Sequence, residues 1–258
     1  MSAPTFRLTA AGRFEYPTGM ALAQPPLADV LARMQELTGS LPAKDGVACF
    51  ARLYLHVTEG VQQELAGVTF RDPVFLDRLD VAFADLFFAA VTKQPPAWAP
   101  LFEDRAARHV APLQFALAGM SAHINRDLPV ALVATANELG HALEEGSPQH
   151  ADFETVNTVL ARVERTVKQQ YLTGFLRTLD RLVHRVHRLD DVVAMWDVAR
   201  ARDAAWANGQ ALWALRGSPA VADAYLDALD RMVGLTARGL LVPAETWLQR
   251  LARLTRGN

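Results

Sequence analysis

Residues 81–91 read VAFADLFFAAV, a run in which Asp85 is the only polar residue. The run lies downstream of Asp72-Pro73, a capping residue followed by proline at the first helical position. A helix that is apolar on all sides is buried inside a larger protein. The run is also too short to cross a bilayer, which needs about 20 apolar residues. It therefore predicts a core helix of a globular helical protein.

Helical periodicity extends from this run in both directions along the chain. The longest pattern covers residues 153–182 and follows a loop at residues 146–148. Alternating β-branched runs bounded by hairpin turns are scarce, which argues against a sheet. We predict an all-α, single-domain bundle of about eight to ten helices over residues 26–258, after an irregular N-terminal segment at residues 1–25. Helix start signals stand at Asp45, Asp72-Pro73, Pro112, Asp127-Leu128-Pro129, Asp190-Asp191, Ser218-Pro219 and Pro243.

Composition and charge limit the classes of function. The chain has 258 residues, 51% of them hydrophobic, and its net charge is −2 at pH 7. A nucleic-acid surface needs a basic excess, so we expect no nucleic-acid partner. Cys49 is the only cysteine, which excludes an intramolecular disulfide and suits a reducing compartment. With neither a signal-peptide pattern nor an apolar run of membrane length, we expect a cytoplasmic protein without a membrane span.

Asp85 is a polar residue in apolar surroundings. Its neighbours one helical turn away include Val81 and Phe88. A carboxylate in such a place must be paired, hydrogen-bonded or protonated, because an isolated buried charge costs many kcal/mol. Two interpretations follow. Asp85 forms a structural ion pair with an arginine, for example Arg52, or it is a catalytic carboxylate.

His123 and Asp127 form a second candidate site. They lie four residues apart after a long apolar helix, so they share a face if the helix continues. Imidazole and carboxylate at this spacing can form a base with its orienting acid, or hold a zinc or iron ion. In the alternative interpretation, Pro129 makes Asp127 the N-cap of the next helix, and His123 ends the previous one.

His150 is the third candidate, in the segment His150-Ala151-Asp152-Phe153. We interpret Asp152 as the N-cap of the long helix that follows. His150 would then join His123 and Asp127 as a ligand of one divalent metal ion, zinc or iron.

Arg202 and Trp206 lie one helical turn apart and form a fourth candidate. An arginine stacked on tryptophan stabilises helix packing. The same guanidinium can instead bind an anionic group of a ligand through two hydrogen bonds. Both interpretations stay open from the sequence.

Several of these segments resemble an uncharacterised bacterial family, domain of unknown function 5995. The resemblance covers most of the chain, from about residue 45 to 215, and it is most specific around His123. It implies that these blocks belong to one fold, and it implies no activity. Within its blocks, Tyr54 and Asn125 are the further polar residues that we expect to contact a substrate, with Arg202 and Trp206. The blocks are residues 45–50 with Tyr54, residues 78–86, 112–120, 123–129, 150–153 and 204–206.

Three functions follow from these candidates. The first is a helical enzyme with an interior pocket for an apolar small molecule, with metal-assisted hydrolysis as one version. Its polar lining would be Asp85, His123, Asp127 and His150. The second is a non-catalytic binding or scaffold domain, in which the polar cluster is structural. The third is a metal-free isomerase or cyclase, in which Asp85 or Asp127 is a general acid with a raised pKa.

Overall fold

The computed structural model describes residues 7–8, 14–15, 27–179 and 197–242. The helix starts expected at Asp190-Asp191 and at Pro243 lie outside the described residues. Of the segment expected to be irregular, residues 7–8 and 14–15 form two short antiparallel strands, β1 (Arg7–Leu8) and β2 (Phe14–Glu15). Their register places Arg7 opposite Glu15 and Leu8 opposite Phe14.

The rest of the described chain is helical, which confirms the all-α fold class. One π-helical segment, η1, joins α5 to α6 without a break, so these three elements form one continuous helix, residues 112–139, called here the central helix. Counted in this way, the described residues form eight helices, close to the number expected. Their bounds are α1 (Leu27–Ser40), α2 (Gly46–Leu65), α3 (Pro73–Lys93), α4 (Ala99–Asp104), α5 (Pro112–Ala122), η1 (His123–Asp127), α6 (Leu128–Leu139), α7 (Pro148–Leu179), α9 (Val198–Leu215) and α10 (Pro219–Leu240).

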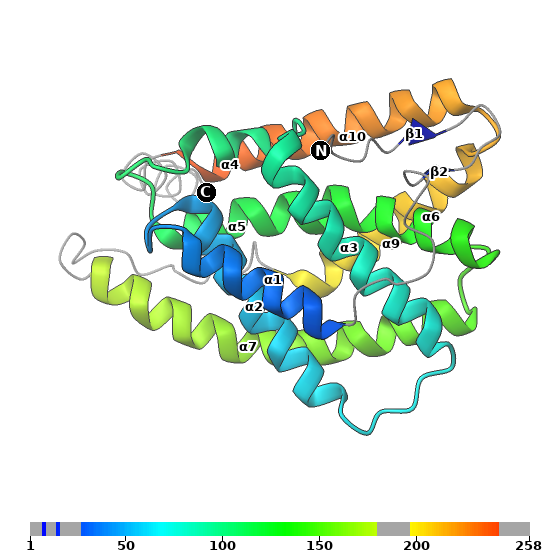
Figure 1. The fold of residues 1–258 in the computed structure, drawn as a ribbon, viewed down its shortest axis with the longest axis horizontal. Helices are drawn as coiled ribbons and strands as arrows, with labels where there is room; N and C mark the ends of the chain where they lie inside the picture. The colour runs from blue at the N-terminus through cyan, green and yellow to red at the C-terminus, as the bar shows by residue number, and fades with distance from the viewer. Residues whose placement is uncertain (1–6, 9–13, 16–26, 180–196, 243–258) are drawn as a thin grey trace, which may run out of the picture.

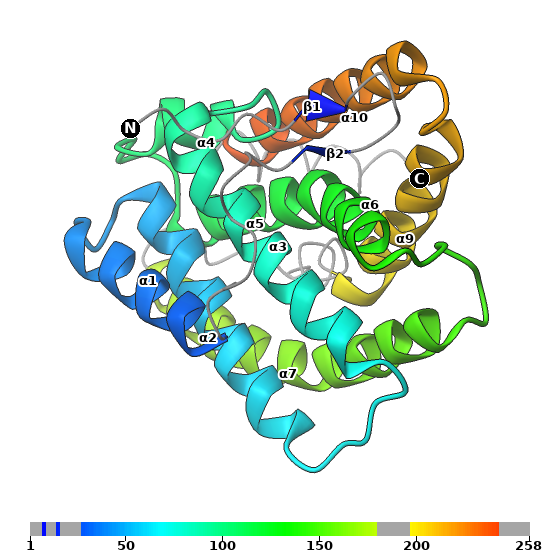
Figure 2. The ribbon, with the colours of Figure 1, turned by 45° about the vertical axis from the view of Figure 1, so that its right-hand side comes forward.

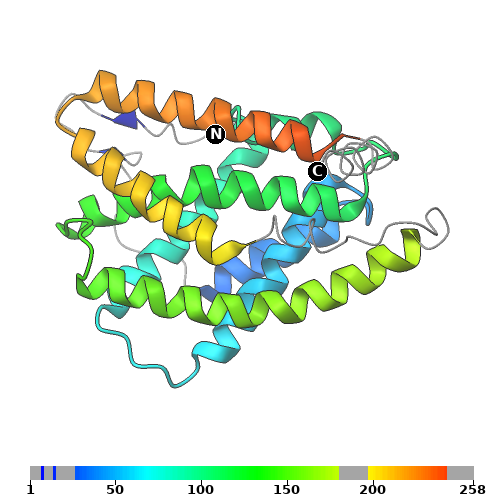
Figure 3. The same cartoon turned by 180° about the vertical axis from the view of Figure 1, so that it is seen from behind.

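The central helix lies in the middle of the molecule. Figure 1 shows it in green, between α10 (orange) above and α7 (lime) below, and the view from behind shows the same order (Figure 3). α3 crosses one side of it (Figure 2) and contacts α6, and α9 packs against α6 on the other side. α2 and α10 contact α5. A helix covered in this way must be apolar on nearly all sides, and α5 and α6 are.

Local signals in the sequence place several of these helices. Asp45 and Asp72 cap α2 and α3, each accepting hydrogen bonds from backbone N–H groups of the first turn. α2 and α5 approach closely at Gly119, where an added Cβ would lie 2.4 Å from the ring of Phe50. No helix in the described part of the chain combines the length and the apolar character that crossing a membrane requires.

The junction at Pro129 differs from the cap that we considered. Asp127 has helical backbone angles and its side chain caps nothing, so that interpretation is wrong. Instead, the N–H of Leu128 bonds to the carbonyl of His123, five residues earlier, which defines the π turn. A proline inside a helix cannot donate to the carbonyl four residues before it and crowds that carbonyl. The wider turn before Pro129 accommodates it without ending the helix.

Candidate functional site

A cavity of about 90 Å³ lies where six of the described helices meet. α1, α2, α3, the central helix, α7 and α9 each contribute to its walls. Most of the wall is aliphatic or aromatic, and a few polar side chains interrupt it, which is the usual character of a small-molecule site. Its lining residues are Val30, Tyr54, Val57, Thr58, Val61, Asp80, Phe83, Met120, His123, Ile124, Val156, Leu160, Val198 and Arg202.

Asp80 places a carboxylate in this cavity from α3. Within the described part of the chain, the carboxylate has no hydrogen bond and no ion pair. Asp80 keeps accessible surface and counts as an exposed residue, but it lines a partly open cavity beside the buried Phe83. The surrounding protein removes enough water from the carboxyl to raise the pKa of Asp80 from 3.8 to about 6, although the positive charge of Arg202 opposes this rise.

Arg202 brings the opposite charge into the cavity from α9. The residue is only 7% exposed, and its guanidinium lies over the ring of Phe153, 4.2 Å from the ring centroid. Its Nε donates to Oδ1 of Asn157 at 2.5 Å. Burial lowers the pKa of Arg202 to about 10, against the attraction of Asp80, so the guanidinium stays charged at neutral pH.

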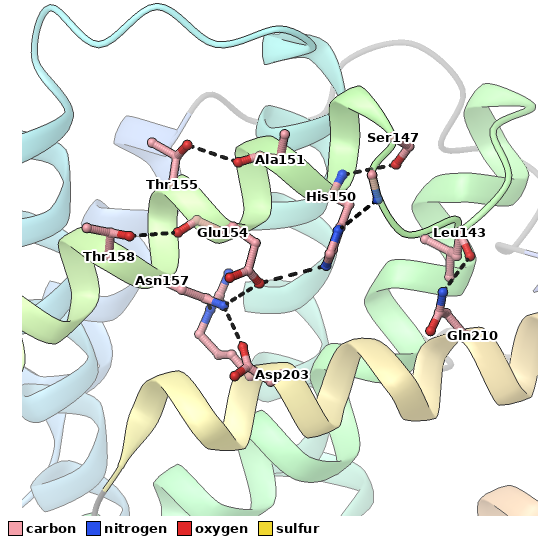
Figure 4. A network of polar contacts seen from close by, with 12 residues as sticks. Leu143, Ser147, His150, Ala151, Glu154, Thr155, Asn157, Thr158, Asp203 and Gln210 are labelled. Atoms are coloured by element: carbon pink, nitrogen blue, oxygen red, sulfur yellow. Dashed lines mark hydrogen bonds and ion pairs between the residues drawn. The ribbon is translucent and has the colours of Figure 1, made fainter.

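A polar network on α7 fixes the position of Asn157. Its amide nitrogen donates to Glu154 Oε1 at 3.1 Å and to Asp203 Oδ1 at 3.0 Å. Figure 4 shows Asn157 reaching from α7 towards Asp203 on α9, with His150 and Glu154 beside it on α7. With both donors of the amide satisfied, its carbonyl oxygen is left to accept from Arg202. The network thus orients the guanidinium from behind.

His123 is part of the cavity wall and is 1% exposed. Its Nδ1 lies 3.1 Å from Oδ2 of Asp127. Burial lowers the pKa of His123 more than Asp127 raises it, so the ring is neutral at pH 7. A neutral ring beside a carboxylate carries its proton on Nδ1 and donates it, which leaves Nε2 as an acceptor. Nε2 is buried and has no hydrogen-bond partner in the described structure.

Aromatic rings hold the imidazole of His123 in place. Phe83 stacks on it with centroids 3.6 Å apart and an angle of 6° between the planes. Tyr54 meets it edge-on at 4.5 Å. Burial, together with the charge of Asp80, raises the pKa of Tyr54 well above its ordinary value, so its hydroxyl is neutral. That hydroxyl has no hydrogen bond among the described residues and Tyr54 lines the cavity.

Asp127 lies behind His123 and is fully buried. Besides His123, its carboxylate accepts from Trp98 Nε1 at 3.0 Å and from an Nη of Arg126 at 2.9 Å. Nε of Arg126 lies 3.6 Å from Asp230, whose carboxylate also accepts from a buried backbone N–H. Charge-assisted hydrogen bonds on both oxygens make Asp127 a fixed orienting group for the imidazole.

A family model described as a family of unknown function, DUF5995, matches residues 27–243. The chain belongs to DUF5995. This match confirms the resemblance seen around His123 and extends it to all helices of the described fold. Searches of curated proteins and of solved structures give no match. The site of this DUF5995 protein must therefore be interpreted from its own geometry.

Three residues expected from the sequence meet at the cavity: Tyr54, His123 and Arg202. Asp127 supports His123 from behind. The other expected substrate contacts do not line the cavity. Asn125 in the π turn donates to the carbonyl of Ser121 on α5, at 3.1 Å, and Trp206 packs against His150 and Phe153.

Asp85 lies away from the cavity and is paired. Its Oδ1 is 2.7 Å from an Nη of Arg33 on α1, and the guanidinium of Arg33 lies over Phe88. The structural interpretation of Asp85 therefore fits its surroundings, with Arg33 in the place for which Arg52 was suggested. Arg52 instead donates to the carbonyl of Ala43.

His150 belongs to the network behind Arg202 rather than to a metal centre. Its Nδ1 accepts from the N–H of Gly146 at 3.1 Å, and its Nε2 lies 3.8 Å from Glu154. In the described ranges, no three His, Cys, Asp or Glu side chains are grouped so that they could hold a metal ion. The donor set expected for zinc or iron thus does not fit. Asp152 does not cap α7, which begins at Pro148; its carboxylate accepts from the backbone N–H groups of Arg71 and Asp72.

Asp80 is the residue that the sequence argument missed. It lies in the segment Asp77-Arg78-Leu79-Asp80, which has ordinary surface composition. A signal was nevertheless present, because Asp80 shares one helical stripe with Leu76, Phe83 and Phe87, all buried. A carboxylate on the buried stripe of a helix is a stronger signal than one on any other face.

Proposed function

We propose that this DUF5995 protein is a metal-free acid–base enzyme that moves a proton on a small, mostly apolar substrate. One observation supports it most: the carboxyl of Asp80, with its pKa raised to about 6, lies in an apolar cavity with the unpaired edge of Arg202. A carboxyl that titrates near neutral pH can both take up and release a proton during turnover. This is the isomerase or cyclase alternative, with Asp80 in the role considered for Asp85 or Asp127.

Asp80 is the proton-transferring group in this proposal. Its carboxylate takes a proton from a substrate carbon, and the electron pair stays on the substrate. The carboxylic acid so formed returns the proton to another carbon, so that an isomerisation has no net proton change. Arg202 stabilises the negative charge that develops on the substrate, and the surrounding aliphatic wall makes this attraction stronger than it would be in water.

Tyr54 offers the substrate a neutral hydrogen-bonding group in this proposal, because its hydroxyl has no partner among the described residues and the residue lines the cavity. His123 is neutral too, but its Nε2, an acceptor without a partner there, is covered by protein, so the ring forms part of the cavity wall. Asp127 sets the tautomer of His123 and so determines that the free nitrogen accepts a hydrogen bond.

A second candidate function is a non-catalytic binding protein that uses the same cavity. The observation in its favour is the enclosure of His123, whose ring is stacked on Phe83 and whose Nε2 is covered by protein. Such a ring supports the cavity wall without taking part in chemistry. The two candidates agree on the cavity and differ on whether Asp80 transfers protons.

Deuterium incorporation tests proton transfer without knowledge of the substrate. The full chain is incubated in D₂O with a small-molecule extract of cells, and mass spectrometry records which compounds gain deuterium on carbon. We expect at least one small apolar compound to gain deuterium with the wild-type protein and not with Asp80→Asn. Asp85→Asn is the matched control, because it alters a carboxylate on the same helix outside the cavity and should keep the activity.

The outcome separates the two candidates. Loss of incorporation in Asp80→Asn but not in Asp85→Asn supports the enzyme. If no compound gains deuterium, or if Asp80→Asn retains the wild-type rate, the acid–base proposal is wrong and the binding function is favoured.

A further inference from the structure

The guanidinium of Arg202 uses one of its donors and leaves the rest for a ligand. Only Nε makes a hydrogen bond, to Asn157. The two Nη groups have no hydrogen-bond partner among the described residues. They are also not fully buried, so both keep some accessible surface. They are therefore in contact with the cavity that Arg202 lines. Two parallel N–H donors at a cavity surface match the two oxygens of a carboxylate.

The positive charge of Arg202 also lacks a close counter-ion. Asp80, Glu154 and Asp203 are near enough to influence its pKa. None of them forms an ion pair with it, and no other described residue does. A charged group that is 93% buried is stable only if it is paired, and Arg202 is 7% exposed. An anionic ligand would complete this pair.

The walls of the cavity determine the size and chemical character of the ligand's remaining part. Four of the side chains that line the cavity with Arg202 are aliphatic: Val57, Val61, Val156 and Leu160. The volume of about 90 Å³ is below the roughly 150 Å³ of an engineered cavity that holds benzene, and this cavity is partly open. The fitting group is a short aliphatic chain, or a single ring that extends into the open side of the cavity.

We propose that the cavity binds small apolar monocarboxylates, with the carboxylate on the Nη groups of Arg202 and the apolar part on the valine and leucine wall. This inference rests on the proposed function and names the class of its substrate. It also assigns separate tasks to the two charged residues, since Arg202 recognises the carboxylate and Asp80 remains free to transfer a proton.

Binding of a carboxylate should be coupled to protonation of Asp80. A negative charge on Arg202 lies near Asp80 and favours its neutral form, so binding is accompanied by partial proton uptake at neutral pH, and the fraction of Asp80 that stays ionised is the form that acts as the base. The other ionisable groups at the cavity do not compete, because the rings of Tyr54 and His123 are neutral. Behind Arg202, Glu154 and Asp203 are held by the amide of Asn157.

Isothermal titration calorimetry with benzoate and hexanoate tests this inference, with benzyl alcohol and hexanamide as neutral probes of matching shape. We expect the carboxylates to bind at least ten-fold more tightly than the neutral probes. Arg202→Gln should remove that preference and leave binding of the neutral probes unchanged. The matched control is Arg200→Gln, on the same helix, where the side chain is 87% exposed.

A second variant keeps the test valid if Arg202→Gln does not fold. Asp80→Asn removes the negative charge beside the ligand, so benzoate should bind several-fold more tightly at pH 7.5 than it does to the wild type. Its affinity should also become independent of pH between 5 and 8, whereas that of the wild type should fall as the pH rises through about 6.

The results distinguish the inference from the proposed function. Binding of the neutral probes as tight as that of the carboxylates overturns the carboxylate class, even if deuterium incorporation by Asp80 is observed. Absence of binding by all four probes overturns it too. Carboxylate binding that depends on Arg202, without deuterium incorporation, supports the ligand class and overturns the enzyme.

Discussion

Replacing Asp80 by asparagine should make the protein more stable at neutral pH. In the unfolded chain this carboxyl ionises at its ordinary pKa of 3.8, and in the folded protein at about 6. The folded state therefore holds the proton more tightly. The proton on Asp80 therefore adds to the free energy of unfolding. This contribution is complete below pH 3.8 and is lost as the pH rises through 6. Asparagine has a similar shape and no charge, so the variant avoids this loss.

The size of the effect follows from the two pKa values. At a pH above 6, their difference corresponds to about 3 kcal/mol in the free energy of unfolding. Asp80 borders a cavity that is partly open to water, and screening reduces the effect. We therefore expect Asp80→Asn to raise the free energy of unfolding by about 1–2 kcal/mol at pH 7.5, and by progressively less towards pH 4.5.

Urea denaturation of wild type and variant at a series of pH values measures this difference directly. Acidification also affects His123, whose lowered pKa makes the folded state less stable below its ordinary pKa of 6.5. That effect is common to both proteins and cancels in the comparison. Asp85→Asn serves as control, because loss of its partly exposed ion pair with Arg33 should lower stability by up to about 1 kcal/mol. A destabilised Asp80→Asn, or a difference that does not vary with pH, would refute the reasoning.

Three further predictions concern the core around the cavity. Asp127→Asn should lower the free energy of unfolding in urea by about 3–5 kcal/mol, because it leaves buried donors without their acceptor; a loss below about 1 kcal/mol would contradict this. Gly119→Ala should lower it by about 1–3 kcal/mol, since the new Cβ would meet the ring of Phe50 at 2.4 Å. Gly39→Ala, where no atom lies within 4 Å, should be neutral or stabilising. At pH 7, ¹⁵N NMR should show His123 neutral with its proton on Nδ1, and a protonated ring would be inconsistent with its lowered pKa.

Local physics explains which features could be predicted from the sequence. Asp72-Pro73 starts α3 as expected, because a cap and an N-terminal proline act within one turn of the helix. The pairing of His123 with Asp127 also followed from a local spacing. The alternative interpretation of Asp127 as a cap was wrong, because the π turn allows Pro129 to continue a buried helix that packing holds on all sides.

The remaining features depend on how helices pack against one another. The partner of Asp85 is Arg33, because α1 packs against α3, and no spacing in the sequence shows which helices are neighbours. Asp85 attracted attention because its neighbours in sequence are apolar. Asp80 has polar neighbours in sequence and is itself exposed, yet it shares a helical stripe with buried residues and lines the cavity. The residues adjacent in space, rather than in sequence, determine which carboxylate meets the cavity.

The separation of Asp80 from Arg202 is the strongest argument that the cavity has a function. Opposite charges in a medium of low dielectric attract strongly, and a core shaped only for stability would bring them into contact or replace both with apolar groups. Here Asn157 and Phe153 hold the guanidinium, while α3 fixes the backbone of Asp80. Each charge therefore weakens the fold in the absence of a ligand. A variant that is more stable but no longer binds ligand or transfers protons would show that the function requires this loss of stability.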